Sequence, residues 1–245
     1  SQLAGNLCRC TGYKPIVDAA LEACNKTSLH EFQTNPVGQG MFVGDAQRFF
    51  AAPANLEELD QLVAEHQDAT LVSGATDVGL WITKQLRDLP KVIYLGNVAE
   101  LKNIHQNDQT IRIGAAVTYK AAFDVLADLD PDVKSVLTRL GSEHVRAAGT
   151  IGGNIANGSP IGDSPPLLIA LGADLSLRRK GYVRDMKLQD FFIAYGKQDR
   201  QADEYVSEIR VPKLKTDQHF RAYKISKRFD QDITATLGAF WFELS

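Results

Sequence analysis

The sequence predicts an α+β fold of two subdomains, a small parallel αβ unit followed by a mostly antiparallel sheet with helices. Strand-like and helix-like segments alternate between residues 47 and 95, which is typical of parallel βαβ units. After residue 172, several strand-like segments follow one another with few helical patterns between them. The chain has 245 residues, of which 44% are hydrophobic, and is therefore long enough to bury a sizeable core in one or two domains.

The elements expected in the first half start with a helix. Residues 16–24 have helical spacing, and Pro15 is well placed near the start of that helix. Residues 25–46 are polar and glycine-rich and are expected to be a linker. The parallel unit should then contain, in order, a strand at 49–52, a helix at 56–66, a short strand starting at Leu71, a helix ending at Leu86 and a strand at 91–95.

The second half should supply the antiparallel sheet and its helices. Residues 110–119 are expected to form a strand, and residues 121–129 and 132–141 to form helices. Ser164 is the expected cap of a helix that is opened by Pro165 and Pro166 and stops at Gly172. Further strands are expected at 174–179, 205–211 and 236–244.

Composition and charge exclude some classes of function. The formal net charge is −3 and there is no basic run, which argues against a nucleic-acid surface. The longest apolar runs are too short to span a membrane. Three cysteines are too few for a disulfide framework, and no signal peptide is visible, so we expect a cytoplasmic protein.

The most informative segment is 149–163, GTIGGNIANGSPIGD. Its five glycines permit close approach of a ligand, while its isoleucines anchor the chain and its asparagines offer hydrogen-bonding side chains. This combination favours a site for a diphosphate or a ribityl chain, and a well-ordered surface loop is the alternative. His144 and Arg146 precede the segment and are expected on a surface strand, although both are near enough to touch a ligand phosphate.

A second small-residue turn follows the short strand at Leu71. Residues 70–79, TLVSGATDVG, predict a strand, a tight turn and a helix start capped by Thr76 or Asp77. Unpaired N–H groups and the helix dipole make such a turn suitable for an anion. An ordinary strand–helix connection is the alternative, because the segment has neither the P-loop spacing nor the Rossmann glycine pattern.

Four motifs together resemble the molybdenum hydroxylases, the family of xanthine dehydrogenase and carbon monoxide dehydrogenase. LVSGATDVG at 71–79 and TIGGNIANGSPIGD at 150–163 resemble the flavin-binding domain of that family. GNLCRCTGY at 5–13 resembles the end of the [2Fe–2S] domain that precedes it, and YKISKRFDQDI at 223–233 resembles the flavin domain of bacterial xanthine dehydrogenase small subunits. The resemblance implies the PCMH-type FAD-binding fold with two subdomains.

The resemblance also implies a division of the chain into four parts. Residues 1–27 are expected to be the C-terminal remnant of a [2Fe–2S] domain, and residues 28–46 a linker. Residues 47–217 are expected to form the FAD-binding domain. Residues 218–245 are expected to start a C-terminal flavoprotein subdomain, which would be truncated here.

The residues expected to bind FAD come from the matching motif positions. The two small-residue turns should hold the diphosphate, Leu140 and Val206 should cover the isoalloxazine ring, and Lys224 should contact the carbonyl edge of that ring. The loop after Lys224, through Asp232, should lie beside the flavin, where it affects access of pyridine nucleotides. The full expected set is Leu71, Val72, Ser73, Gly74, Ala75, Thr76, Asp77, Val78, Leu140, Thr150, Gly153, Asn154, Ile155, Asn157, Asp163, Val206 and Lys224.

Cys8 and Cys10 are the expected metal ligands. A C-x-C pair is awkward for a disulfide, and thiolates at that spacing commonly share a metal or cluster, whereas two unrelated thiols are the alternative. A [2Fe–2S] cluster requires four ligands. The family's other cysteine pair lies upstream in a C-x-x-C motif that this chain lacks, so the cluster is expected only if a missing upstream segment is present.

By resemblance, the expected function is electron transfer in a bacterial-type xanthine dehydrogenase small subunit. Electrons from purine hydroxylation at a molybdenum cofactor in a large partner subunit would pass through [2Fe–2S] clusters to FAD and then to NAD⁺. The chain would work in a hetero-oligomer. Two alternatives are the flavin subunit of a carbon monoxide or aldehyde-type hydroxylase, and a scaffold subunit that binds no flavin.

Overall fold

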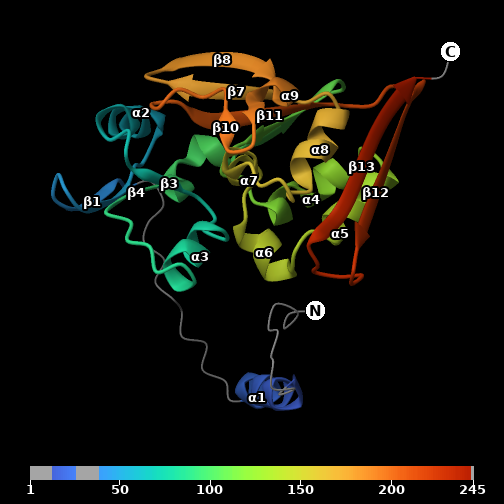
Figure 1. Ribbon diagram of the computed structural model, residues 1–245, viewed down its shortest axis with the longest axis horizontal. Helices are drawn as coiled ribbons and strands as arrows, with labels where there is room; N and C mark the ends of the chain where they lie inside the picture. The colour runs from blue at the N-terminus through green and yellow to red at the C-terminus, as the bar shows by residue number, and fades with distance from the viewer. Residues whose placement is uncertain (1–12, 26–38, 244–245) are drawn as a thin grey trace.

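The computed structural model describes residues 13–25 and 39–243, and two mixed subdomains lie side by side within residues 39–243 (Figure 1). Helix α1, Tyr13–Asn25, covers the segment that was expected to be helical, and Cys24 on it is exposed. Cys8 and Cys10 lie outside the described residues. No helix in the described residues is both long and apolar enough to cross a membrane.

The first subdomain is built on a four-stranded sheet with the order β1-β2-β4-β3. Strands β2, β4 and β3 are parallel, which confirms the predicted parallel unit. Helices α2 and α3 complete the unit, and the side chains of Leu59 and Val63 on α2 are buried in its core. The bounds are β1 Met41–Gly44, β2 Phe49–Ala52, α2 Leu56–Glu65, β3 Thr70–Val72, α3 Val78–Thr83 and β4 Lys91–Tyr94.

Strand β1 corrects the expected linker at 28–46, because it pairs antiparallel with β2 at the edge of the sheet. The connection is a tight turn in which Asp45 accepts hydrogen bonds from the backbone N–H groups of Gln47 and Arg48 at 2.8 and 2.9 Å. Gly44 has a φ of +122°, a conformation that side chains disfavour. The polar, glycine-rich residues therefore make a hairpin turn here.

The second subdomain is built on a five-stranded antiparallel sheet with the order β5-β6-β11-β7-β8. Helices cover one of its faces (Figure 1), and a single apolar core lies between them and the sheet. The strands are β5 Ile104–Gln106, β6 Thr110–Gly114, β7 Asp174–Arg179, β8 Tyr182–Lys187 and β11 Tyr205–Pro212. The smaller elements are the 3₁₀ turns η1 Leu95–Asn97 and η2 Ala99–Lys102 and the short strands β9 Phe192–Ala194 and β10 Lys197–Gln198.

The helices of this subdomain begin at polar caps. The side chains of Thr118, Asp130, Ser142 and Thr150 each accept a hydrogen bond from a backbone N–H in the first turn of a helix. The helices are α4 Tyr119–Ala127, α5 Pro131–Thr138, α6 Glu143–Ala148, α7 Ile151–Asn157, α8 Ser164–Ala170 and α9 Leu188–Phe191.

Several expectations for these segments were wrong in detail. Strand β6 ends at Gly114 instead of residue 119, because the chain turns there: the Val117 N–H donates to the Gly114 carbonyl oxygen at 3.0 Å, and Thr118 then caps α4. His144 and Arg146 lie on helix α6 instead of a strand. Asp163, not Ser164, occupies the cap position of α8, where its side chain makes no capping hydrogen bond.

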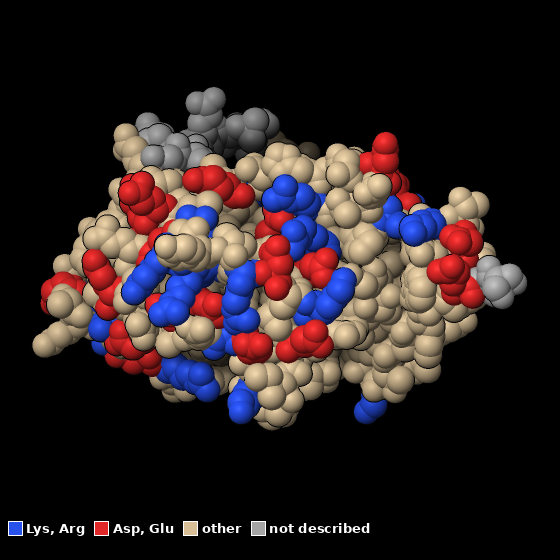
Figure 2. Space-filling model, turned by 90° about the horizontal axis from the view of Figure 1, so that it is seen from above, with Lys and Arg blue, Asp and Glu red and all other residues tan. Residues whose placement is uncertain are grey.

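The outer face of the five-stranded sheet carries interspersed charges of both signs (Figure 2). Ion pairs join strands of the sheet: Arg112 on β6 and Glu208 on the adjacent β11 lie 2.9 Å apart, and Arg210 on β11 reaches across β7 to Asp185 on β8 at 2.7 Å. Such pairs are typical of a solvent-facing sheet surface, where each contributes little to stability. The sheet is therefore solvated on this face and packed on the other.

The last two strands form a hairpin, β12 Gln218–Ser226 and β13 Thr234–Glu243. Its inner face packs against the helices, and Phe220 and Ala222 belong to the core of the second subdomain. The described part of the expected C-terminal subdomain, residues 218–243, therefore packs on the second subdomain. Its outer face exposes large apolar side chains, among them Tyr223, Ile225 and Phe240.

A buried polar contact joins the two subdomains. Asp60 on α2 accepts a hydrogen bond from the Tyr205 hydroxyl at 2.8 Å and forms an ion pair with Arg178 at 2.7 Å. The partners lie 145 and 118 residues from Asp60 in sequence. Because Asp60 comes from the first subdomain and the other two from the second, this contact fixes how the subdomains sit against each other.

Candidate functional site

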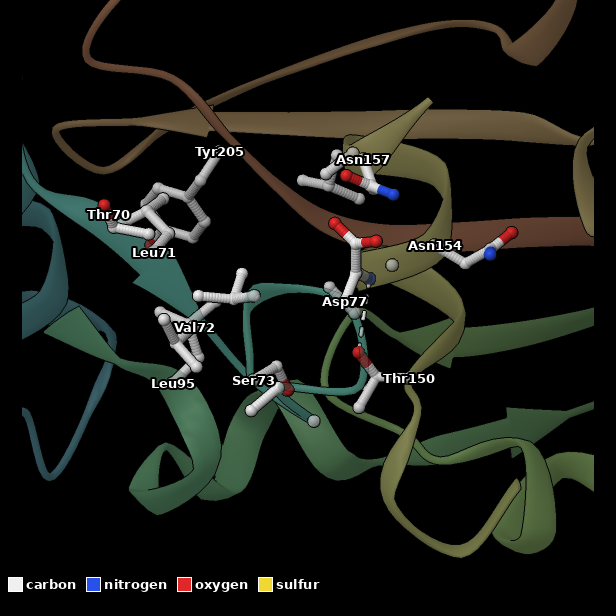
Figure 3. A pocket seen from close by; sticks show the side chains of 18 of the residues that line it. Thr70, Leu71, Val72, Ser73, Asp77, Leu95, Thr150, Asn154, Asn157 and Tyr205 are labelled. Atoms are coloured by element: carbon white, nitrogen blue, oxygen red, sulfur yellow. Dashed lines mark hydrogen bonds between the residues drawn. The ribbon is translucent and has the colours of Figure 1, made fainter. Parts of the chain in front are cut away.

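A cleft of about 630 Å³ lies between the two subdomains. We call it the central cleft. Three walls enclose it: the turn at 73–78 after β3, the N-terminal part of α7, and the start of β11 at Tyr205 (Figure 3). Its volume is within the range of small-molecule and cofactor pockets.

The structure brings most of the predicted site residues together in this one cleft, although they come from four separate segments of the chain. The predicted residues that line it are Leu71, Val72, Ser73, Gly74, Ala75, Thr76, Asp77, Val78, Leu140, Thr150, Gly153, Asn154, Asn157 and Val206.

The turn at 73–78 presents unused hydrogen-bond donors to the cleft. Within the described part of the chain, the backbone N–H groups of Gly74, Ala75, Thr76, Asp77 and Val78 donate to no other residue. Ala75 has a φ of +55°, a left-handed conformation that costs an alanine roughly 1 kcal/mol. Successive free amides in such a turn form a concave site for an anion.

Close packing of two glycine segments holds this turn in place. A side chain at Gly74 would lie 1.9 Å from the carbonyl oxygen of Ala148, so the backbone of the turn contacts the backbone just before α7 directly. Gly149 also lies against this turn, since a side chain there would lie 3.4 Å from the Thr76 hydroxyl. The two turns singled out in the sequence are therefore in direct contact.

Helix α3 departs from its predicted cap. Asp77 occupies the cap position but makes no side-chain capping bond. Its carboxylate instead accepts a hydrogen bond from the Trp81 indole at 3.0 Å. The helix ends at Thr83 instead of Leu86, which has a left-handed φ of +54°.

The second wall is helical, which differs from the surface loop that was the alternative interpretation of this segment. Thr150 caps α7 by accepting from the Gly153 N–H at 3.2 Å, and Ile151 and Gly152 donate their N–H groups to Val117 and Ala115. These amides are therefore used within the protein, and the wall offers side chains to a ligand.

Gly153 is exposed on that wall, and Asn154 beside it is partly buried. The Oδ1 atom of Asn154 is buried and has no hydrogen-bond partner in the described residues. A side chain at Gly153 would meet only the Thr150 side chain, at 2.6 Å, and otherwise project into open space. The wall therefore has room for the close approach of a ligand at Gly153, whereas the unsatisfied Asn154 oxygen is enclosed by protein.

The third wall was missed by the sequence analysis. The ring of Tyr205 lines the cleft and lies near Leu71 and Thr70 (Figure 3). Its hydroxyl is fixed by Asp60, and burial raises the pKa of this phenol well above its usual value. Arg200 and Ala202 extend the same wall. In the sequence, the signal that could have pointed to this wall was an aspartate, Asp60, in the middle of an amphipathic helix.

Tyr119 was also missed and lines the cleft beside the predicted residues. Its hydroxyl lies 2.6 Å from the Ser164 hydroxyl, and burial raises the pKa of this phenol. Tyr119 therefore stays neutral and links the cleft to the start of α8.

Three predicted residues do not line the cleft. Ile155 is fully buried and packs into the core from the far side of α7. Lys224 and Asp163 form a buried ion pair at 2.6 Å, with 3% and 7% of their side chains exposed. Thr234 donates a further hydrogen bond to the Asp163 carboxylate. The charged groups of this pair are thus engaged within the protein, and neither residue lines the cleft.

Arg139 holds the start of the β12–β13 loop next to Leu140. It donates to the carbonyl oxygens of Lys224 and Phe229 at 2.8 and 3.0 Å and to the Ser226 hydroxyl at 2.9 Å. The loop that was expected beside the flavin is therefore anchored to the end of α5. Among the described residues, no cluster of His, Cys, Asp and Glu is arranged to hold a metal ion.

Comparison with known proteins agrees with this geometry. Residues 45–214 match the family described as the FAD binding domain in molybdopterin dehydrogenase. The xanthine dehydrogenase of Emericella nidulans is 26% identical over 98% of this chain, which corresponds to 22% of its own length. The chain thus spans about a fifth of the curated relatives it matches.

Solved structures of similar fold include two bacterial enzymes. Quinoline 2-oxidoreductase from Pseudomonas putida 86 is 26% identical with a TM-score of 0.71, covering 81% of this chain and 68% of that one. Reconstituted CO dehydrogenase from Oligotropha carboxidovorans has a TM-score of 0.74 at 23% identity, covering 83% and 71%. The second likeness concerns the fold alone.

Proposed function

The chain belongs to the family of FAD-binding domains of molybdopterin dehydrogenases, and on this premise we propose that its central cleft binds FAD. The free backbone amides at 74–78 carry the proposal, because a dinucleotide diphosphate requires several N–H donors in one concave turn. The cleft volume also fits such a ligand.

Each wall would have its own task in binding the cofactor. The turn at 73–78 would donate to the diphosphate, and Thr150 with Asn154 and Asn157 would bind sugar or ribityl hydroxyls from the opposite wall. Asp77 is better suited to a hydroxyl than to a phosphate, because its carboxylate accepts and carries like charge. Leu140 and Val206 would give the isoalloxazine ring apolar cover.

FAD would supply a carrier that takes up electrons from one-electron centres and releases them in pairs. We propose that the parent enzyme oxidises a purine at a molybdenum cofactor in a partner subunit, and that NAD⁺ is the final acceptor. The similarity to xanthine dehydrogenases over nearly the whole chain supports this proposal. Cys8 and Cys10 would contribute two of the four ligands of a [2Fe–2S] cluster.

The test of FAD binding is direct. The purified chain, supplied with FAD, should acquire flavin absorption at one FAD per chain. A chain that stays colourless after reconstitution, although it is folded by circular dichroism, would favour the scaffold alternative and contradict the proposal.

The substrate and acceptor need a separate test. The large subunit that co-purifies with this chain should support NADH formation from hypoxanthine or xanthine. A complex that oxidises carbon monoxide or an aldehyde instead would favour the second type of hydroxylase, a possibility consistent with the similar fold of CO dehydrogenase. Iron content should depend on the presence of an upstream segment that carries the other two cysteines.

A further inference from the structure

Arg146 on α6 binds three backbone carbonyl oxygens of the turn that joins α5 to α6. Its Nη1 atom lies 3.1, 2.9 and 3.0 Å from the carbonyl oxygens of Thr138, Leu140 and Gly141. Within the described residues, no backbone N–H of a turn or loop donates to any of these three oxygens. Because the donor is charged, such hydrogen bonds are stronger than those between neutral groups. Arg146 therefore ties the turn to α6.

This turn carries one residue of the cleft wall. Leu140 lines the central cleft, and Gly141 beside it has a left-handed φ of +56°. A side chain at Gly141 would lie 2.9 Å from that of Val145, so the turn packs closely on the helix that bears Arg146. The place of Leu140 in the cleft therefore depends on how the turn is joined to α6.

The other end of α6 is joined to the turn at 73–78. A side chain at Gly74 would lie 1.9 Å from the carbonyl oxygen of Ala148, and the Tyr119 N–H donates to the carbonyl oxygen of Gly149 at 3.0 Å. None of the six residues of α6 is buried, so the burial of apolar side chains contributes little to holding this helix. Its position therefore relies on the backbone contacts at one end and on Arg146 at the other.

We propose that Arg146 is a positioning residue, which fixes Leu140 relative to the turn at 73–78 through α6. The inference rests on the proposed function, in which Leu140 covers the isoalloxazine ring and the turn binds the diphosphate of the same FAD molecule. A wall that is already in place binds its ligand without first being ordered. Without Arg146, the turn keeps the hydrogen bond from the Leu140 N–H to the Leu137 carbonyl oxygen but loses its ties to α6.

Hydrogen exchange of the flavin-free full chain tests this positioning directly. In Arg146→Ala, the amides of residues 139–141 should exchange about tenfold faster or more, which corresponds to the loss of one charge-assisted hydrogen bond. The amides of β11, in the middle of the sheet, should keep their wild-type rates. Arg146→Lys should restore much of the slow exchange, because an ammonium carries three donors. Lys134→Ala removes an exposed cation from α5 and is the matched control, which should change nothing.

The visible circular dichroism of bound FAD is the second measurement, made at saturating FAD on the same four proteins. The flavin bands should lose intensity in Arg146→Ala, because the apolar cover of the ring is no longer held in one place. Arg146→Lys should recover much of that intensity, and Lys134→Ala should match the wild type. Circular dichroism in the far ultraviolet verifies that each variant is folded.

Three results would overturn the proposal. The first is unchanged exchange at residues 139–141 in Arg146→Ala. The second is equal acceleration in β11, since Arg146 would then act through overall stability. The third is an unchanged flavin spectrum at saturation, since Leu140 would then keep its place without Arg146. A wild-type chain that binds no FAD would instead refute the proposed function, and hydrogen exchange would still decide whether Arg146 holds the turn.

Discussion

Replacing Gly153 by leucine is the sharpest test of the central cleft. A Cβ atom at this position meets only the Thr150 hydroxyl, at 2.6 Å, and otherwise faces the cleft. The leucine side chain would therefore occupy the space beside the 73–78 turn that a diphosphate needs. We expect Gly153→Leu to purify without flavin while remaining folded.

The stability of this variant can be worked out from the structure. Moving the Thr150 side chain away costs the capping bond to the Gly153 N–H, worth about 1 kcal/mol. Replacing a glycine in a helix raises the free energy of unfolding by about 1 kcal/mol. The free energy of unfolding should therefore change by less than about 1 kcal/mol, and urea unfolding of the flavin-free proteins measures it.

Gly152 provides the matched comparison, because a side chain there would run into the adjacent chain segment at Ala115 instead of open space. A Cβ there would lie 2.4 Å from that of Ala115, so Gly152→Ala must push the backbone and should cost about 1–3 kcal/mol. FAD bound at the wild-type ratio by Gly153→Leu would refute the assignment of the diphosphate to this place. A Gly153→Leu variant less stable than Gly152→Ala would refute the packing argument.

Three further outcomes are expected. Tyr205→Phe should lower the free energy of unfolding by about 1.5–3 kcal/mol, because it removes a buried hydrogen bond to the charged Asp60. The FAD affinity should stay unchanged, since the ring remains, and weaker FAD binding by a fully folded variant would count against this. Lys224→Ala should lower the free energy of unfolding by about 3–5 kcal/mol, because it leaves the buried Asp163 carboxylate without its ion-pair partner. A loss below about 1 kcal/mol in urea unfolding would contradict the ion pair. The Arg184 guanidinium lowers the pKa of Glu204, so this pair stabilises the fold at pH values above the unfolded pKa of about 4.3. That stabilisation disappears as the pH falls through the lower pKa that Glu204 has in the folded protein. Arg184→Leu should therefore flatten this part of the curve of unfolding free energy against pH.

Local sequence signals predicted the two turns because their physics is local. A short apolar strand followed by small residues was sufficient to locate the 73–78 turn, and direct contact with Ala148 explains why small residues are needed there. The segment after Thr150 was harder. Its glycines disfavour a helix, but a capping threonine and the buried pair Ile151 and Ile155, four residues apart, outweigh them.

The third wall could not be predicted from such signals. Tyr205 reaches the cleft because β11 pairs with β6 and β7 in the middle of the sheet, and Asp60 then fixes its hydroxyl from the other subdomain. The contact between Asp60 and Tyr205 spans 145 residues and has no sequence motif. The edge strand β1 was missed for the opposite reason, since its polar and glycine-rich neighbours resemble a linker but form a hairpin turn.

The bridge from Asp60 to Tyr205 and Arg178 has a consequence for how the cleft is filled. A hinged protein closes on its ligand and can adapt its width to several shapes. Here the contacts of Asp60 hold the two subdomains together, so the width of the cleft is set when the chain folds. A cofactor then has to fit a cleft of fixed width. Its thickness and length decide whether it can enter, and the folded protein binds it without rearranging.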